Sequence, residues 1–310
     1  PVGYWKTPEA QAGYEEAYGA AMAALPEPGE VYDVPTDFGT VRVYRWSPPQ
    51  ADDGAPVVLL PGRASGVPMW SVNLPGLIEA RTVYAMDALG DAGLSVQTAS
   101  VKDIHDQNLW LLRTFEALDI RKAHLVGHSY GGLTAAQFAS EYPERVASLS
   151  LLEPVFVFQG VSFRFMVKIM AFFLPIPQRW KDAVLADIAG TDADEIDRDD
   201  PVTRMIAFGT EAYVSQLPFP PLVTDVQMQS WEFPVWVGLA GKSSFNNAAD
   251  CKIRAETNVR TVEVKIWPEG THSLPMEYPE AINELLLKFM REWDTEKQAP
   301  VLNLADLKRE

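Results

Sequence analysis

The chain has 310 residues, of which 47% are hydrophobic and 11% aromatic, so it can form a sizeable core and is not a disordered protein. Its formal net charge of −16 argues against binding to nucleic acid or to an anionic lipid surface. The single cysteine, Cys251, excludes an intrachain disulfide and is best explained as a small buried hydrophobe.

The sequence also lacks the patterns of secretory and membrane segments. The N-terminal PVGYWKTPEAQAGYEEAYG has no basic region followed by an apolar one, and no stretch reaches the roughly 18 apolar residues of a membrane span. Together with the single cysteine, this favours a reducing compartment. We therefore expect a cytoplasmic protein that does not bind membranes, and we leave association into a homo-oligomer open.

The first predicted element is a helix over about residues 7–25. Thr7 and Pro8 are typical of a helix N-terminus, and good helix formers follow them. Two β-rich runs come next, at 31–35 and 40–46, separated by TDFG. This spacing predicts a hairpin.

Strands and helices then alternate along the chain. Apolar, β-rich runs predict strands at 56–62, 81–90, 122–129 and 145–154, and amphipathic stretches predict helices at 100–120 and 133–144. A strand covered on both faces reads as a short, continuous apolar run, as 56–62 does. The order of elements predicts an α/β fold with a mostly parallel sheet and helices on both faces.

This alternation stops after Pro154. Residues 155–230 contain a stretch rich in Phe and Met, an acidic stretch and a Pro-rich stretch, none of which resumes the pattern. Strands at 233–241 and 260–270, followed by a helix at 277–293, restore it.

The predicted organisation therefore has three parts. Residues 1–154 and 231–292 form the core, with the helix at about 7–25 added to it, and 155–230 form a helical lid or cap. Residues 293–310 are a polar tail to which no structure is assigned.

The stretch GHSYG, residues 127–131, satisfies G-x-S-x-G and lies directly between a predicted strand and a predicted helix. In this motif the serine occupies a sharp turn, and the glycines let the backbone pass closely between the two elements. The context favours Ser129 as a nucleophile over a structural Gly-rich turn. Tyr130 would then offer its backbone N–H to an oxyanion at the helix N-terminus.

A second oxyanion donor should come from the loop after the strand at 56–62. Arg63 follows Pro-Gly at the end of that strand, and its backbone N–H is the candidate. The alternative is that Pro-Gly merely ends the strand. The Arg63 side chain would either turn inward, where it could bind an anionic group, or remain exposed.

Four histidines are available to take the serine proton. His124 lies within a predicted strand, His105 lies on an amphipathic helix, and His128 should point away from the serine that follows it. His272 follows a predicted strand and precedes the last helix, in the chain order serine, acid, histidine. We predict His272 as the general base, with an ordinary loop histidine as the alternative.

These stretches together resemble the α/β-hydrolase superfamily and, within it, the carboxylesterases and lactonases. The resemblance is carried by PVVLLPG, VYAMDALG, LVGHSYGG, FPVWVGLAG and GTHSLPMEYPE, which span most of the chain outside the N-terminal helix and the tail. It implies an eight-stranded sheet, a lid inserted after the sixth strand, and hydrolysis through an acyl-enzyme.

The acid implied by this resemblance is missing from its usual place. Most members carry Asp or Glu in a turn after the penultimate strand, whereas GLAGKSS has Ser244 there. Glu153, directly after the strand at 145–154, resembles in position the catalytic Glu of some haloalkane dehalogenases. We predict that Glu153 orients His272. Asp250, or no acid at all, is the alternative.

The predicted function is that of a serine hydrolase that cleaves an ester, lactone or thioester of a largely apolar small molecule. The insertion is dense in Phe and Met, so Phe156 and Phe163, with Trp70 from the core, are the predicted substrate-binding residues. Core packing is the alternative for these residues. An acyltransferase or another biosynthetic enzyme on the same triad, and a non-catalytic ligand-binding protein, are the competing functions.

No metal or cofactor is expected from the sequence. The histidines lack the paired spacing of metal ligands, and the motifs that bind nucleotide phosphates do not occur.

Overall fold

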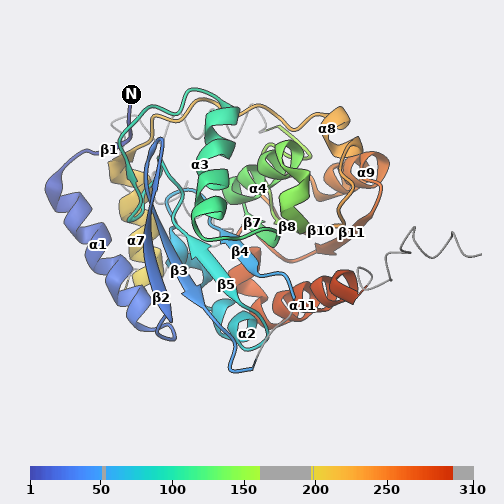
Figure 1. Ribbon diagram of the computed structural model, residues 1–310, viewed down its shortest axis with the longest axis horizontal. Coiled ribbons are helices and arrows are strands. Elements are labelled where there is room, and N and C mark those ends of the chain that lie inside the picture. Colours follow the sequence, from blue (N-terminus) through green and yellow to red (C-terminus); the bar gives the residue numbers. More distant parts are fainter. Residues whose placement is uncertain (51–53, 161–196, 198, 296–310) are drawn as a thin grey trace, which may run out of the picture.

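A mostly parallel sheet runs through the part of the chain that the computed structural model describes, namely residues 1–50, 54–160, 197 and 199–295 (Figure 1). Eight strands follow one another across it in the order β11-β10-β8-β7-β4-β5-β3-β2. In chain order they are β2 (Glu30–Thr36), β3 (Gly39–Trp46), β4 (Val57–Leu60), β5 (Val83–Met86), β7 (Ala123–His128), β8 (Val146–Leu152), β10 (Val235–Ala240) and β11 (Val262–Trp267). They coincide with the eight predicted strands. The two-residue β6 (Val96–Gln97), which the prediction lacks, pairs with β3.

Six of these strands are parallel to one another, and the other two form an antiparallel hairpin at one edge. The parallel pairs are β4 with β5 and β7, β8 with β7 and β10, and β10 with β11. β2 and β3 pair antiparallel, and β3 also runs antiparallel to β5. The predicted α/β fold class with a mostly parallel sheet is confirmed.

Helices connect these strands, and four of them, α1, α3, α4 and α11, match the helices predicted individually from the sequence. In chain order the described helices are α1 (Pro8–Ala23), η1 (Val67–Trp70), α2 (Leu74–Ile78), α3 (Ile104–Ala117), α4 (Tyr130–Glu141), η2 (Pro143–Arg145), α7 (Pro201–Ala212), α8 (Asp225–Gln229), α9 (Ala248–Asn258), α10 (Leu274–Glu277) and α11 (Pro279–Thr295). The Thr7 hydroxyl accepts a hydrogen bond from the Ala10 N–H at 3.2 Å and so caps α1.

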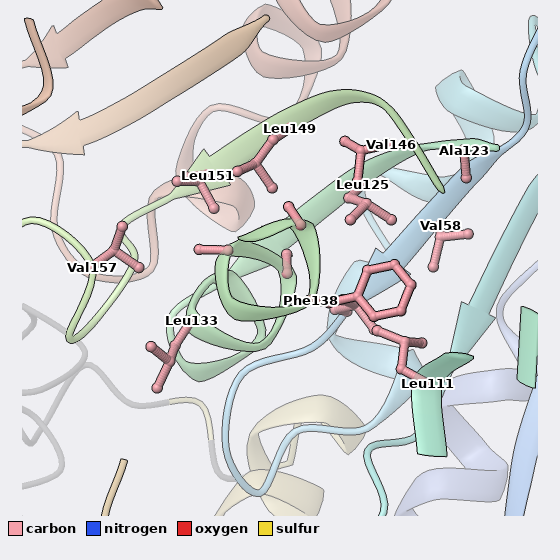
Figure 2. Close-up of a cluster of buried hydrophobic side chains, with 14 of the residues drawn as sticks. Val58, Leu111, Ala123, Leu125, Leu133, Phe138, Val146, Leu149, Leu151 and Val157 are labelled. Carbon is pink, nitrogen blue, oxygen red and sulfur yellow. The ribbon is translucent and has the colours of Figure 1, made fainter. Parts of the chain in front are cut away.

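The central strands bury side chains on both faces, which explains their continuous apolar sequence. On one face, Val58 of β4 and Leu125 of β7 belong to a cluster with Phe138 of α4 (Figure 2). Their neighbours in the strands, Leu59 and Val126, point the other way into a second cluster with α2 and α11. Cys251 of α9 is 1% exposed in the first cluster, and burial raises the pKa of its thiol to about 12, as an inert core residue requires.

Two described elements of the insertion, α7 and β9 (Tyr213–Val214), lie against the N-terminal segment, whereas α8 contacts α9. β1 (Tyr4–Trp5) pairs antiparallel with β9, and α1 lies beside α7 (Figure 1). The lid assignment stays a prediction, because residues 161–196 are outside the described part of the chain. None of the described helices is long and apolar enough to cross a membrane.

Candidate active site

Ser129 occupies a strained turn between β7 and α4. Its backbone has φ 54° and ψ −118°, in a region that residues with a side chain rarely adopt. The two motif glycines permit this turn because each lies against another part of the backbone. A Cβ at Gly131 would lie 2.2 Å from the Leu60 carbonyl oxygen, and one at Gly127 would lie 2.4 Å from the Gly131 carbonyl oxygen. The turn therefore requires both glycines.

Gly131→Ala is expected to displace the turn and destabilise the protein. The added methyl group meets backbone atoms of β4 that cannot rotate away, and overpacking of this kind costs about 1–3 kcal/mol or more. The free energy of unfolding in urea measures the loss. Gly160→Ala is the matched control, since a Cβ there meets nothing within 4 Å. Equal stability of the two variants would contradict the close approach.

The structure brings together the three residues predicted as nucleophile, base and acid. His272 Nε2 lies 2.9 Å from Ser129 Oγ, and His272 Nδ1 lies 3.3 Å from Glu153 Oε2. Their exposed fractions are 9% for Ser129, 7% for His272 and 0% for Glu153. With Nδ1–H donating to the carboxylate, Nε2 is left as the acceptor of the serine proton.

Glu153 is held by donors on both carboxylate oxygens. The backbone N–H of Ala240 donates to Oε1 at 2.7 Å, and the hydroxyl of Ser243 donates to Oε2 at 2.5 Å. These bonds offset the cost of burying a charge. Asp250 lies exposed in the first turn of α9, and the described contacts of His272 include Glu153 rather than Asp250.

His128 also contacts His272, through the backbone of the loop that carries it. Its Nε2–H donates to the His272 carbonyl oxygen at 2.8 Å, and the ring centroids are 5.0 Å apart. Burial lowers the pKa of His128 to about 3, so the ring is neutral at physiological pH. His128 therefore ties the loop that carries His272 to the strand that carries Ser129. Sequence reasoning missed this contact because no local pattern marks a histidine ring that bonds to the backbone of a distant loop.

The loop that follows β4 lies beside Ser129. A Cβ at Gly62 would come within 3.3 Å of the Ser129 Cβ, so the predicted oxyanion loop reaches the serine. Asp91 fixes this loop by accepting a hydrogen bond from the Ala64 N–H at 3.0 Å. The Arg63 side chain is exposed; its guanidinium lies 4.7 Å from the centre of the Tyr130 ring and donates to Ser215 Oγ at 3.2 Å.

Backbone strain is concentrated around these residues. Four of the five non-glycine residues with positive φ in the described chain lie here: Ala64 (59°), Ser129 (54°), Glu153 (46°) and Phe156 (56°). Such conformations cost about 1–3 kcal/mol each and persist only where the surroundings enforce them. Their clustering supports a functional role for this end of the sheet.

The predicted substrate-binding residues have different environments. Trp70 is 1% exposed within the second core cluster, so the structure favours core packing for its ring. Phe156 is half-buried and contacts the exposed Phe219 edge-on, with centroids 5.3 Å apart. Phe163 lies outside the described residues. Phe219, but not Phe156, lines a groove of about 260 Å³, whose other lining residues are Lys102, Asp103, Ile104, Gln107, Tyr130, Pro218, Pro220 and Pro221.

A second serine–histidine–aspartate line exists elsewhere in the sheet. His124 Nδ1 lies 2.7 Å from Ser148 Oγ, and His124 Nε2 lies 3.1 Å from Asp294 Oδ1. Ser148 and His124 are 0% exposed, and Ser148 lies within β8 rather than at a strand-to-helix turn. With no access for a substrate, this line links α11 to the sheet, as expected for a structural His124.

Comparison with known sequences finds a similar family. A sequence model of the α/β-hydrolase fold matches residues 55–193, a range that includes β4, β7, β8 and Ser129. Over this range the chain is similar to the α/β-hydrolases, and its mostly parallel sheet with helices on both faces is the fold of that superfamily.

Relatives of this hydrolase in Bacillus subtilis (strain 168) match it over most of its length. Carboxylesterase YbfK is 26% identical over 284 residues, which are 89% of this chain and 93% of the relative. The uncharacterized carboxylesterase nap is 25% identical over 298 residues, 89% and 91% of the two chains. The crystal structure of naproxen esterase (carboxylesterase NP) from B. subtilis has a TM-score of 0.81 to the hydrolase at 23% identity, covering 91% of this chain and 99% of that one.

The chemistry available at the site comes from side chains and backbone donors. In the described part of the hydrolase, no group of three or more His, Cys, Asp or Glu side chains could hold a metal ion. The arrangement can activate a serine hydroxyl, stabilise an imidazolium and, from the loop after β4 and the N-terminus of α4, offer N–H donors to an oxyanion.

Proposed function

We propose that this chain is a carboxylesterase in which Ser129 is the nucleophile, His272 the general base and Glu153 the orienting acid. The observation that carries the proposal is the 2.9 Å contact between Ser129 Oγ and His272 Nε2 at a strand-to-helix turn, backed by a buried carboxylate. The carboxylesterase relatives support the same reaction. A complete set of three residues favours catalysis over a purely ligand-binding role.

In the proposed first half-reaction, Ser129 Oγ attacks the acyl carbon as its proton passes to His272 Nε2. Glu153, within 3.3 Å of Nδ1, stabilises the imidazolium that forms. The backbone N–H groups of Tyr130 and Arg63 bind the tetrahedral oxyanion. His272 then gives the proton to the leaving alcohol, and the ester carbon remains bound to Ser129 as an acyl-enzyme.

In the second half-reaction, water replaces the alcohol. His272 takes a proton from the water as its oxygen attacks the acyl carbon, and the same proton returns to Ser129 when the acid leaves. Lactones and thioesters would react by the same steps, and an alcohol in place of water would give acyl transfer. Apolar surface around Phe156 and Phe219 supports a largely apolar substrate.

A fluorophosphonate probe is expected to label the folded protein on Ser129, because only an activated serine displaces fluoride rapidly. Mass spectrometry of the digested protein locates the adduct, and hydrolysis of p-nitrophenyl esters should be lost with the labelling. Ser129→Ala should abolish both signals. Ser148→Ala is the matched control, since Ser148 also contacts a histidine but is fully buried, and it should retain both. Folded wild-type protein without an adduct on Ser129 would refute the proposal.

A further inference from the structure

The loop between β10 and α9 contains the position where a hydrolase of this family usually carries its acid, and it contacts Glu153 instead. Ser243, one residue before the expected position, donates its hydroxyl to Glu153 Oε2 at 2.5 Å. The same oxygen lies 3.3 Å from His272 Nδ1. One carboxylate oxygen therefore faces both the serine and the histidine.

The Ser243 hydroxyl is oriented by its own loop. Its oxygen accepts hydrogen bonds from the N–H groups of Phe245 at 3.2 Å and Asn246 at 3.1 Å. Because a hydroxyl has one proton and its lone pairs face these two donors, the proton is directed at Glu153. The geometry is that of a fixed donor rather than a freely rotating hydroxyl.

The rest of this loop is attached to the chain that follows Glu153. The Asn246 side-chain amide donates to the Pro154 carbonyl at 3.1 Å, and the Asn247 N–H donates to Gln159 Oε1 at 2.8 Å. The Phe245 ring lies against the His272 ring, with centroids 4.1 Å apart. The loop thus contacts both the acid and the base from one side.

We infer that Ser243 is a positioning residue for the relocated acid: its hydroxyl holds Glu153 Oε2 where it can accept the His272 Nδ1 proton. The inference rests on the proposed function, because it assigns Ser243 a role within that triad. Glu153 lies at the end of β8 with a strained backbone, φ 46°, and its side chain has to reach a histidine that normally pairs with the loop after β10. Ser243 supplies the link to that loop.

Ser243→Ala is the test, with Ser243→Thr as the variant that keeps the hydroxyl and Ser244→Ala as the control in the same loop. Loss of a hydrogen bond to a buried charged group should lower kcat for a p-nitrophenyl ester about 10- to 100-fold in Ser243→Ala. KM should change less than about twofold, because Ser243 Oγ is directed at Glu153 rather than at Ser129. Ser243→Thr should recover most of kcat, and Ser244→Ala should retain it.

A second readout separates positioning from a merely structural role. The far-downfield proton NMR signal of the His272 Nδ1–H reports its bond to Glu153 directly, and Ser243→Ala should shift or broaden it while Ser243→Thr restores it. An unshifted signal together with kcat within about twofold of wild type would overturn the inference. So would a Ser243→Thr variant as impaired as Ser243→Ala although both melt at the wild-type temperature.

Failure of the proposed function would look different. A wild-type protein without ester turnover and without probe labelling on Ser129 would refute the carboxylesterase proposal. The His272 Nδ1–H signal would still report whether Ser243 holds Glu153 in place. A triad that turns over esters while Ser243→Ala leaves the signal and kcat untouched refutes only the role of Ser243.

Discussion

Glu153→Gln is expected to lower kcat for ester hydrolysis by about 10³- to 10⁴-fold, the scale on which loss of the orienting acid acts in serine hydrolases. Glutamine fills the same volume, and its oxygen can still accept from the Ala240 N–H. The amide nitrogen of the introduced glutamine then faces His272 Nδ1 and donates to it. The imidazole is driven to the tautomer with its proton on Nε2, which cannot accept the proton of Ser129.

Steady-state turnover of a p-nitrophenyl ester measures this effect, and Asp250→Asn is the matched control. The control removes a carboxylate of the neighbouring segment in the same isosteric way, but from an exposed position, so kcat should stay within about twofold of wild type. Full activity of Glu153→Gln combined with a large loss of activity in Asp250→Asn would mean that Asp250, and not Glu153, orients His272. Full activity of both would leave the histidine without an orienting acid.

The strands could be predicted from the sequence because a strand buried on both faces reads as a short run of mostly apolar residues. β4 reads VVLL and β8 reads VASLSLL, and each lies between helices that cover both sides of the sheet. Elements without such a mark were missed. β1 and β9 have two residues each and exist only because segments more than 200 positions apart pair with each other. α9 is polar on average and buries only Cys251 and Ala255, so no apolar run in its sequence marks it.

Some residues of the candidate site could be predicted from their local sequence, and others only from contacts between distant parts of the chain. Ser129 could be predicted because its flanking glycines record the close packing of α4 against β4, and His272 because of its place after the last strand. Glu153 could be proposed only from its place at a strand end. Ser243 and His128 act through contacts across 90 and 144 positions, and neither residue type in its local context indicates such a partner.

Stability below neutral pH is expected to depend strongly on His128. Burial and, to a smaller extent, the nearby His272 ring lower its pKa from 6.5 to about 3, against the opposing effect of the bond to the His272 carbonyl. The unfolded chain therefore binds a proton at His128 as the pH falls below about 6.5, whereas the folded chain does not until about pH 3. Folding stability from the neutral ring is complete above pH 6.5 and is lost progressively as the pH falls, by up to about 1.4 kcal/mol per pH unit.

His128→Gln tests this dependence, because glutamine can place an amide donor near the position of Nε2 and does not titrate. At about pH 7.5 the variant should be somewhat less stable than wild type, because the packing of the imidazole ring is lost. The pH dependence of its unfolding free energy should be shallower. Between about pH 6.5 and 4.5, urea unfolding should show wild type losing about 2–3 kcal/mol more than the variant. Parallel curves would mean that His128 gains its proton as easily in the folded protein as in the unfolded chain, which is incompatible with a neutral ring buried against the His272 loop.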